Sequence, residues 1–266
     1  SITIITIAIL LSAILSARSL KSNLEQKAFY TEIVQIREKI NNFKLIYDYL
    51  PGDFPNAGKL FNSTLSTCTD ELIDSGYGTS DRSGCNGDGD NNWDINLISC
   101  CFGEGYMVWL HLQLAALIGS PRSGDEYYNG YSNIGNPQSD NNNLYQSKTY
   151  IDILLLPTET WFEAMSHPST RYPKLLAMPV STEYEFATNK GVFTPLEMQQ
   201  IDLKFDDGWP KLGNIEGYRF WSDTSTTQTY CLTAEESMTS STDFTQVTYD
   251  ITNNEKSCIA HFLIKD

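Results

Sequence analysis

The sequence predicts an α+β fold, in which a long N-terminal α-helix packs on a C-terminal antiparallel β-sheet head with long loop insertions. Three observations lead to this prediction. Residues 1–50 contain no glycine or proline and keep a helical spacing of apolar residues. Short segments of alternating apolar residues occur near the C-terminus, and Gly/Asn/Ser-rich stretches separate the segments of the head. We therefore expect two parts, a helix over residues 1–50 and a disulfide-stapled globular head over residues 51–266.

The first seventeen residues carry no charge, and the first cation is Arg18. As a helix they would extend about 26 Å, slightly less than the hydrocarbon core of a membrane. A secretory signal peptide would start with a basic region, which is not seen here, and a buried core helix is a further alternative. We expect a helix that is inserted in a membrane or buried by other subunits. Its candidate assembly residues are Ile2, Ile5, Ile9, Leu11, Ile14 and Leu15.

The second half of the expected helix is amphipathic. Apolar residues recur every three or four positions, which predicts one stripe packed on the head. Pro51-Gly52 is expected to end the helix. The residues of the stripe are Ile33, Ile36, Ile40, Phe43 and Tyr47. The polar residues expected on other faces are Glu32, Arg37, Lys39, Asn41 and Lys44.

The charge is distributed unevenly along the chain. The net charge is −15, yet residues 1–50 carry six cations and four anions, for a net +2. The other 216 residues carry 12 cations and 29 anions, for a net −17. A chain this acidic is repelled by phosphate backbones, which excludes nucleic acid as a structural partner.

Three segments resemble a family of type IV pilin-like and pseudopilin-like proteins, the bacterial prepilin-type proteins with N-terminal cleavage and methylation signals. Residues 49–57 (YLPGDFPNA) are similar to the family's LPGDMPNA element. Gly87-Asp88-Gly89-Asp90, followed by residues 109–118 (WLHLQLAALI), resembles a polar loop and a WQHLxLAGLI helix. Residues 194–197 (TPLE) and 201–210 (IDLKFDDGWP) resemble the IDxKIDDGxP element.

The resemblance implies a structural subunit of a type IV pilus-like extracellular filament, a homo-oligomer formed through the hydrophobic helix with the acidic head on the surface. It implies that the chain resides in the bacterial inner membrane before assembly and interacts with a pilus or secretion assembly machinery. One alternative is a periplasmic pseudopilin of a type II secretion system. Another is a monomeric membrane-anchored binding module or adhesin. The family's early glutamate, which contacts a neighbouring subunit during assembly, aligns before Ser1.

The six cysteines indicate disulfides and an oxidising compartment, since none shows metal-binding CxxC spacing. The pair expected to staple the C-terminal strands, as is common in pilins, is Cys231 and Cys258. The other four are Cys68, Cys85, Cys100 and Cys101. Because a ring between vicinal cysteines is strained, we expect each of the first two to cross to one of the last two, with the choice left open. Free buried thiols are the alternative.

A polar loop has oxygen-bearing side chains at alternate positions, as calcium loops do. Trp93 and Ser99 stand where an EF-hand needs its glycine and its bidentate glutamate, so the loop is not an EF-hand. Glu104 or another acidic loop would have to complete a calcium site, and the alternative is a solvated turn. The candidate calcium ligands are Asp88, Asp90, Asn92 and Asp94.

Catalytic motifs are absent from the sequence, and we expect no enzymatic activity. There is no G-x-S-x-G, H-E-x-x-H, P-loop or G-x-G-x-x-G pattern. His111 lies in an apolar helical run and is expected to be a hydrogen-bonded core residue. Asp206-Asp207 precedes Gly208-Trp209-Pro210, which favours a turn over a catalytic pair.

In the head we expect a second helix, two strands, a long exposed loop and a C-terminal antiparallel sheet. The helix is expected over residues 103–118, and the loop over residues 120–148. The strands are expected over residues 149–156 and 174–179, and the C-terminal sheet over residues 217–221, 229–233, 246–251 and 258–264.

Overall fold

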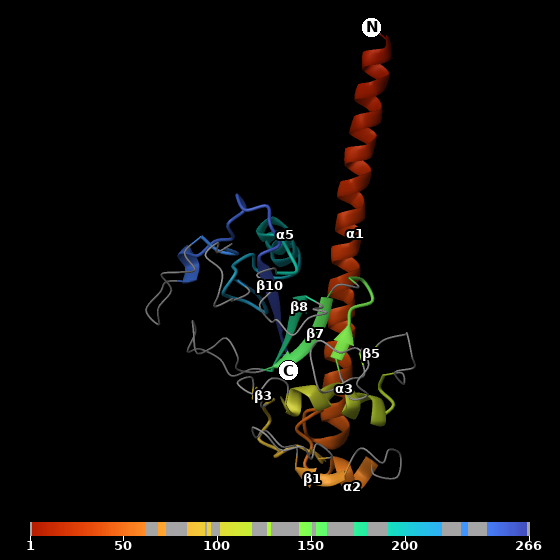
Figure 1. The fold of residues 1–266 in the computed structure, drawn as a ribbon, viewed down its shortest axis with the longest axis vertical. Helices are drawn as coiled ribbons and strands as arrows, with labels where there is room; N and C mark the ends of the chain where they lie inside the picture. Colours follow the sequence, from red (N-terminus) through yellow and green to blue (C-terminus); the bar gives the residue numbers. More distant parts are fainter. Residues whose placement is uncertain are drawn as a thin grey trace.

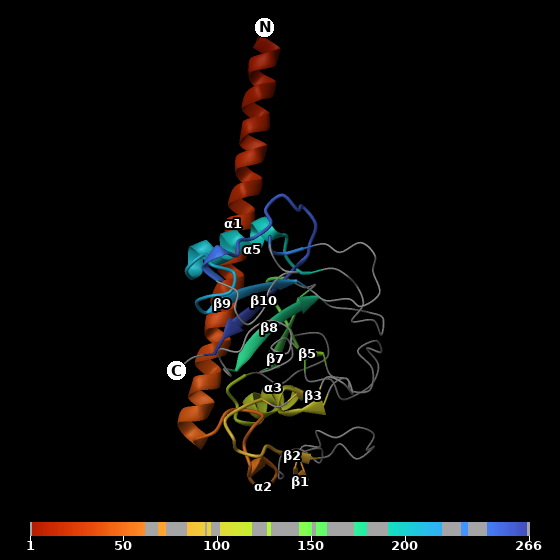
Figure 2. The same cartoon turned by 90° about the vertical axis from the view of Figure 1, so that its left-hand side faces the viewer.

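The molecule is a long helix, α1 (Ile2–Tyr47), with a head attached to its C-terminal half (Figure 1). The N-terminal half of α1 projects beyond the head in both views (Figures 1 and 2). This computed structural model describes residues 2–61, 69–72, 84–93, 95–96, 102–118, 127–128, 144–150, 153–158, 173–179, 191–219, 230–233 and 244–264.

The described part of the head contains short helices and strands in a mixed order. They are α2 (Ala57–Phe61), β1 (Thr69–Leu72), β2 (Gly84–Asn86), β3 (Ile95–Asn96), β4 (Phe102–Gly103), α3 (Glu104–Leu114), β5 (Tyr127–Tyr128), β6 (Leu144–Gln146), β7 (Ile153–Thr158), β8 (Lys174–Pro179), α5 (Pro195–Phe205), β9 (Ile215–Arg219), the 3₁₀ helix η2 (Phe244–Gln246) and β10 (Cys258–Leu263).

The helix α1 is continuous over 46 residues, which corresponds to about 69 Å. The absence of glycine and proline from this segment explains its continuity. It ends at Tyr47, because Asp48 adopts a left-handed conformation with φ 63° and its N–H still donates to the Lys44 carbonyl at 2.8 Å. The helix therefore stops before Pro51-Gly52 and three residues earlier than the predicted end at residue 50.

The head is built on a six-stranded antiparallel sheet with the order β5-β6-β7-β8-β10-β9. In β10, Ala260 pairs with Ala177 of β8 on one side and with Gly217 of β9 on the other. Side chains alternate along a strand, so Phe262 lies on the same face as Ala260. The ring of Phe29 on α1 is 5.7 Å from that of Phe262, which identifies this face as the one that α1 covers.

The predicted apolar stripe of α1 forms the centre of the core. Ile33, Ile36, Ile40 and Phe43 are buried, and Tyr47 is half-buried against the core. The fold is thus a mixed α+β arrangement of one long helix on an antiparallel sheet.

Below the sheet, α3 and the chain after α1 pack tightly against each other. The N–H of Gly52 donates to Nδ1 of His111 at 2.8 Å, and Nε2 of His111 donates to the Cys85 carbonyl at 2.9 Å. Gly52 has φ +95°, and a Cβ there would collide with the Glu104 carbonyl. Glycine is therefore required at this position, and His111 is the hydrogen-bonded core residue predicted from the sequence.

Three predictions about the head need correction. The segment 120–148, predicted as one long loop, contributes β5 and β6 to the sheet. The strand predicted to start at Thr149 begins at Ile153, because residues 147–150 form a turn against α1. Of the four C-terminal strands, β9 and β10 belong to the sheet, whereas residues 231–233 and 248–250 meet through a single bridge between Leu232 and Tyr249.

The structure joins Cys231 and Cys258 by a disulfide with an S–S distance of 2.00 Å. This is the pair expected from the sequence, and it connects the bridge segment to the start of β10. Cys85 is also disulfide-bonded. The other three cysteines, Cys68, Cys100 and Cys101, lie outside the described residues.

Candidate assembly surface, acidic cluster and groove

The projecting half of α1 exposes large apolar side chains, and we call this segment, residues 4–24, the apolar arm. These side chains are between 50% and 72% exposed. They are Ile4, Ile5, Ile7, Ile9, Leu10, Leu11, Ile14, Leu20 and Leu24. Four of the six predicted assembly residues, Ile5, Ile9, Leu11 and Ile14, are therefore exposed. The structure does not describe the side chains of Ile2 and Leu15.

The helix α5 holds the apolar arm where it leaves the head. The ring of Phe205 stacks on Tyr30 with 4.2 Å between ring centroids. The amide of Gln26 donates to that of Gln200 at 3.2 Å, and Lys204 donates to the Asn23 carbonyl at 3.3 Å. These contacts fix the direction in which the arm projects.

The sequence explains why α5 forms at this point. Thr194 caps the helix, since its hydroxyl accepts the N–H of Glu197 while the Glu197 carboxylate accepts the N–H of Thr194. Pro195 follows the cap, where its missing N–H costs nothing. The TPLE element is therefore a capping box.

The acidic residues after α5 stabilise a turn, as predicted. The Asp206 carboxylate accepts the N–H groups of Asn214 and Ile215, and Asp207 accepts the N–H of Trp209 at 2.8 Å. The buried Asp202 accepts the Gly208 N–H at 3.0 Å. Burial raises the pKa of Asp202 from 3.8 to about 6, and the charges of Asp207 and Asp206 add to that rise. Every carboxylate here has a structural partner.

A second group of carboxylates, the acidic cluster, consists of Asp53, Asp88, Asp90 and Glu104, with one oxygen of each within 4.8 Å of the others. Asp53 and Glu104 are buried, whereas Asp88 and Asp90 are exposed. Glu104 lies at the start of α3, where the helix dipole favours a negative charge. Its Oε1 accepts the N–H of Asp88 at 2.8 Å.

Asp53 shapes the loop that carries the exposed members of the acidic cluster. Its two oxygens accept the N–H groups of Gly89 at 2.5 Å and of Asn91 at 2.7 Å. Burial raises its pKa from 3.8 to about 6, partly offset by those two hydrogen bonds, and the charge of Asp90 raises it further. Asp53 therefore holds a proton more tightly than an isolated aspartate does.

The structure brings two of the four candidate calcium ligands, Asp88 and Asp90, into the cluster. The Asn92 side chain lies beside the cluster and donates to Asp90 at 3.2 Å, and Asp94 lies outside the described residues. A set of carboxylate oxygens fits a hard divalent cation. Both oxygens of Asp53 and both oxygens of Asp90 already accept N–H groups, so a cation in the cluster would share these oxygens with their donors. Calcium binding stays a prediction.

Sequence reasoning missed Asp53 as a member of this cluster. It lies 35 residues before Asp88, in the LPGDFPNA segment. An acidic residue within a motif that resembles a family element was the available signal. Its role depends on a contact between distant segments, which a local ligand spacing cannot reveal.

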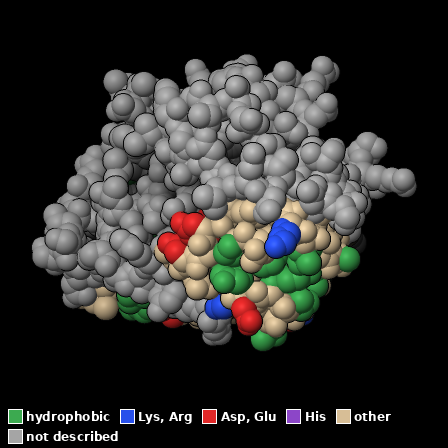
Figure 3. Space-filling model, turned by 90° about the horizontal axis from the view of Figure 1, so that it is seen from below, with side chains coloured by type: hydrophobic (Ala, Val, Ile, Leu, Met, Phe, Trp, Pro, Cys, Tyr) green, Lys and Arg blue, Asp and Glu red, His purple; other side chains and the backbone are tan. Residues whose placement is uncertain are grey.

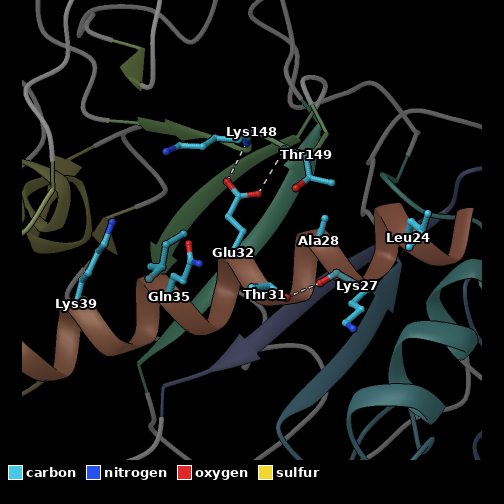
Figure 4. Close-up of a pocket in the computed structure, with 10 residues that line it drawn as sticks. Leu24, Lys27, Ala28, Thr31, Glu32, Gln35, Lys39, Lys148 and Thr149 are labelled. Carbon is cyan, nitrogen blue, oxygen red and sulfur yellow. Dashed lines mark hydrogen bonds between the residues drawn. The ribbon is translucent and has the colours of Figure 1, made fainter. Parts of the chain in front are cut away.

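A groove of about 430 Å³ runs along α1 where the turn at residues 147–150 approaches the helix (Figure 4). Its centre is Glu32, which the amphipathic pattern had placed on an outer face but which is only 7% exposed. The Glu32 carboxylate accepts the hydroxyl of Ser147 and the N–H of Lys148, each at 2.8 Å. Burial of this charge is possible because the turn supplies the donors.

Lysines surround the groove. Lys39 and Lys148 extend on the side of α1 to which Glu32 points, whereas Lys27 extends away on the other side (Figure 4). Lys39 forms no salt bridge with any residue in the described ranges. The groove is thus locally basic on an acidic molecule.

A smaller apolar surface lies at the opposite end of the molecule from the arm. Viewed from below, hydrophobic side chains gather there beside a few charged ones (Figure 3). Exposed large hydrophobic residues at this end are Leu45 and Ile46 at the end of α1 and Leu60 on α2, with Leu45 80% exposed. Nothing in the structure indicates what covers this surface.

Comparisons of the chain with protein-family models, with curated proteins and with solved structures found no match. The pilin-like interpretation therefore rests on the sequence motifs. Among the residues that the structure describes, no helix has a stretch long and apolar enough to cross a membrane.

Proposed function

We propose that this chain is a structural subunit of a type IV pilus-like extracellular filament. The apolar arms of neighbouring copies would pack together in the filament, and the acidic heads would face solvent. The observation that supports this proposal is the apolar arm, nine large hydrophobic side chains left in contact with water by a single copy. Large exposed apolar surfaces of this kind mark protein–protein or membrane contacts.

The hydrophobic effect would drive assembly. Burial of one isoleucine or leucine side chain contributes about 1.5–3 kcal/mol, so several such residues per copy outweigh the entropy lost on association. The arm carries little charge, whereas the rest of the chain after residue 50 has a net charge of −17. This distribution of charge suits a subunit whose helix is buried in the filament and whose head faces solvent and repels the heads of other copies.

Electron microscopy of sheared cell-surface material tests this proposal. We expect uniform fibres that contain this chain, identified by labelling with an antibody against the head. Short fibres confined to the periplasm would favour the type II secretion alternative. A detergent-soluble monomer without fibres would contradict the proposal and favour the monomeric anchored module.

A further inference from the structure

We infer that the groove beside α1 receives the acidic loop of residues 87–93 from a second copy of this chain. The inference rests on the proposed function, because it describes how two neighbouring subunits of the filament contact each other.

The charge of the groove favours an acidic occupant. Lys39 and Lys148 present ammonium groups on one side of the groove, which the polar side chain of Gln35 also lines (Figure 4). Among the described residues that line it, Glu32 is the one anion, and its carboxylate already accepts hydrogen bonds from the turn at residues 147–149. The whole chain has a net charge of −15, so another copy of the chain offers acidic surface that is complementary in charge to the lysines of the groove.

The loop of residues 87–93 has the charge of such an occupant. Asp88 and Asp90 are exposed, and Asp53 fixes the loop backbone by accepting the N–H groups of Gly89 and Asn91. A preformed loop loses little conformational entropy on binding. It therefore presents two carboxylates in a fixed geometry.

The positions of loop and groove along α1 define how two copies would be arranged. The loop lies beyond the end of α1, with Gly89 against Tyr49 and Pro55. The groove is centred on Glu32, fifteen residues before Tyr47. Two copies with parallel helices would therefore bring loop and groove together when staggered by at least about 22 Å, the length of α1 from Glu32 to its end. Parallel helices also allow the apolar arms of the two copies to pack against each other.

Charge reversal in the full-length chain tests the contact. Exposed ion pairs are individually weak, and reversing two lysines should lower the yield of sedimentable filaments about tenfold. We expect this loss for Lys39→Glu/Lys148→Glu and for Asp88→Lys/Asp90→Lys, and recovery when all four changes are combined. The double variant Lys59→Glu/Lys256→Glu, which changes charge equally at two exposed lysines outside the groove, should assemble normally.

Cross-linking of wild-type filaments provides a second measurement that does not depend on the folding of variants. A carbodiimide joins amines to carboxylates in direct contact. In filaments mixed from isotopically light and heavy subunits, we expect mixed-label peptides that connect Lys39 or Lys148 to residues 87–93.

Three outcomes would overturn the inference. Normal filaments from Lys39→Glu/Lys148→Glu would show that the groove makes no such contact while the proposed function stands. Mixed-label peptides that connect these lysines only to other segments would mean that a different surface occupies the groove. The absence of filaments from the wild-type chain would overturn the proposed function and this inference together.

Discussion

The hydroxyl of Tyr249 donates a 2.7 Å hydrogen bond to Oδ2 of Asp202, and this contact ties the C-terminal segment to α5. Both residues are buried. Because α5 stacks on α1 through Phe205 and Tyr30, the Tyr249–Asp202 contact helps fix the point at which the apolar arm leaves the head.

We predict that Tyr249→Phe destabilises the fold by about 1–3 kcal/mol at pH 7.5, because it leaves a buried carboxylate without one of its donors. The loss should be smaller at pH 4.5, where Asp202 is largely protonated, given its pKa of about 6. Denaturant unfolding at both pH values measures this. An equal loss of stability at the two pH values would mean that the effect of Tyr249→Phe does not depend on the charge of Asp202.

Three buried groups should make the free energy of unfolding depend on pH. Burial raises the pKa of Asp53 and of Asp202 from 3.8 to about 6, so their protonated forms stabilise the folded state. This contribution is full below about pH 4 and is lost as the pH rises through 6. Burial lowers the pKa of His111 from 6.5 to about 4, so its contribution is full above 6.5 and is lost as the pH falls to 4.

The variant Asp53→Asn separates these opposing effects, because it removes one of the two carboxylates and leaves His111 in place. We expect the fall in the free energy of unfolding between pH 5 and pH 7.5 to be smaller in this variant than in the wild type. Denaturant titrations at the two pH values measure it. Identical pH dependence in both proteins would show that Asp53 titrates normally.

Calcium should stabilise the head if the acidic cluster binds it. We expect added calcium to raise the melting temperature and a chelator to lower it, since a ligand specific for the folded state stabilises it by about 2.7 kcal/mol at 100 times its Kd. Asp88→Asn/Asp90→Asn should abolish the response, whereas Asp206→Asn/Asp207→Asn should preserve it. A wild-type melting temperature that is the same with calcium and with chelator would show that the acidic cluster does not bind calcium.

We predict that Glu32→Gln loosens the turn that borders the groove. Glutamine has one acceptor oxygen where glutamate has two, so the Ser147 hydroxyl or the Lys148 N–H loses its partner, at a cost of about 1–3 kcal/mol. Hydrogen exchange at residues 147–150 should become faster. Glu38→Gln, at an exposed position on the same helix, should change neither quantity. Unchanged exchange in Glu32→Gln would mean that other contacts hold the turn.

Local patterns in the sequence predicted the features that depend on neighbouring residues. The three-and-four spacing of Ile33, Ile36, Ile40 and Phe43 located the buried face of α1, and the apolar neighbours of His111 placed it in the core. The turn after α5 was predicted because aspartates before Gly-Trp-Pro favour one.

Features that depend on distant segments were not predictable in the same way. Helical periodicity assigns charged residues to solvent, yet Glu32 is buried because a turn 115 residues away supplies its donors. The acidic cluster joins Asp53 to a loop 35 residues later and to the start of α3. The strands β5 and β6 have only two and three residues, too few to show an alternating pattern.

A single charge in the apolar arm tests the proposed assembly most directly. Electron microscopy of cell-surface material from cells that produce Ile9→Asp should show no filaments, because a carboxylate at this position would be buried without a partner. The head should keep the wild-type melting temperature, since Ile9 is 63% exposed in the single copy. Asn42→Asp, at an exposed position of the same helix within the head, should form filaments as the wild type does. Filaments of normal number and length from Ile9→Asp would contradict assembly through the arm.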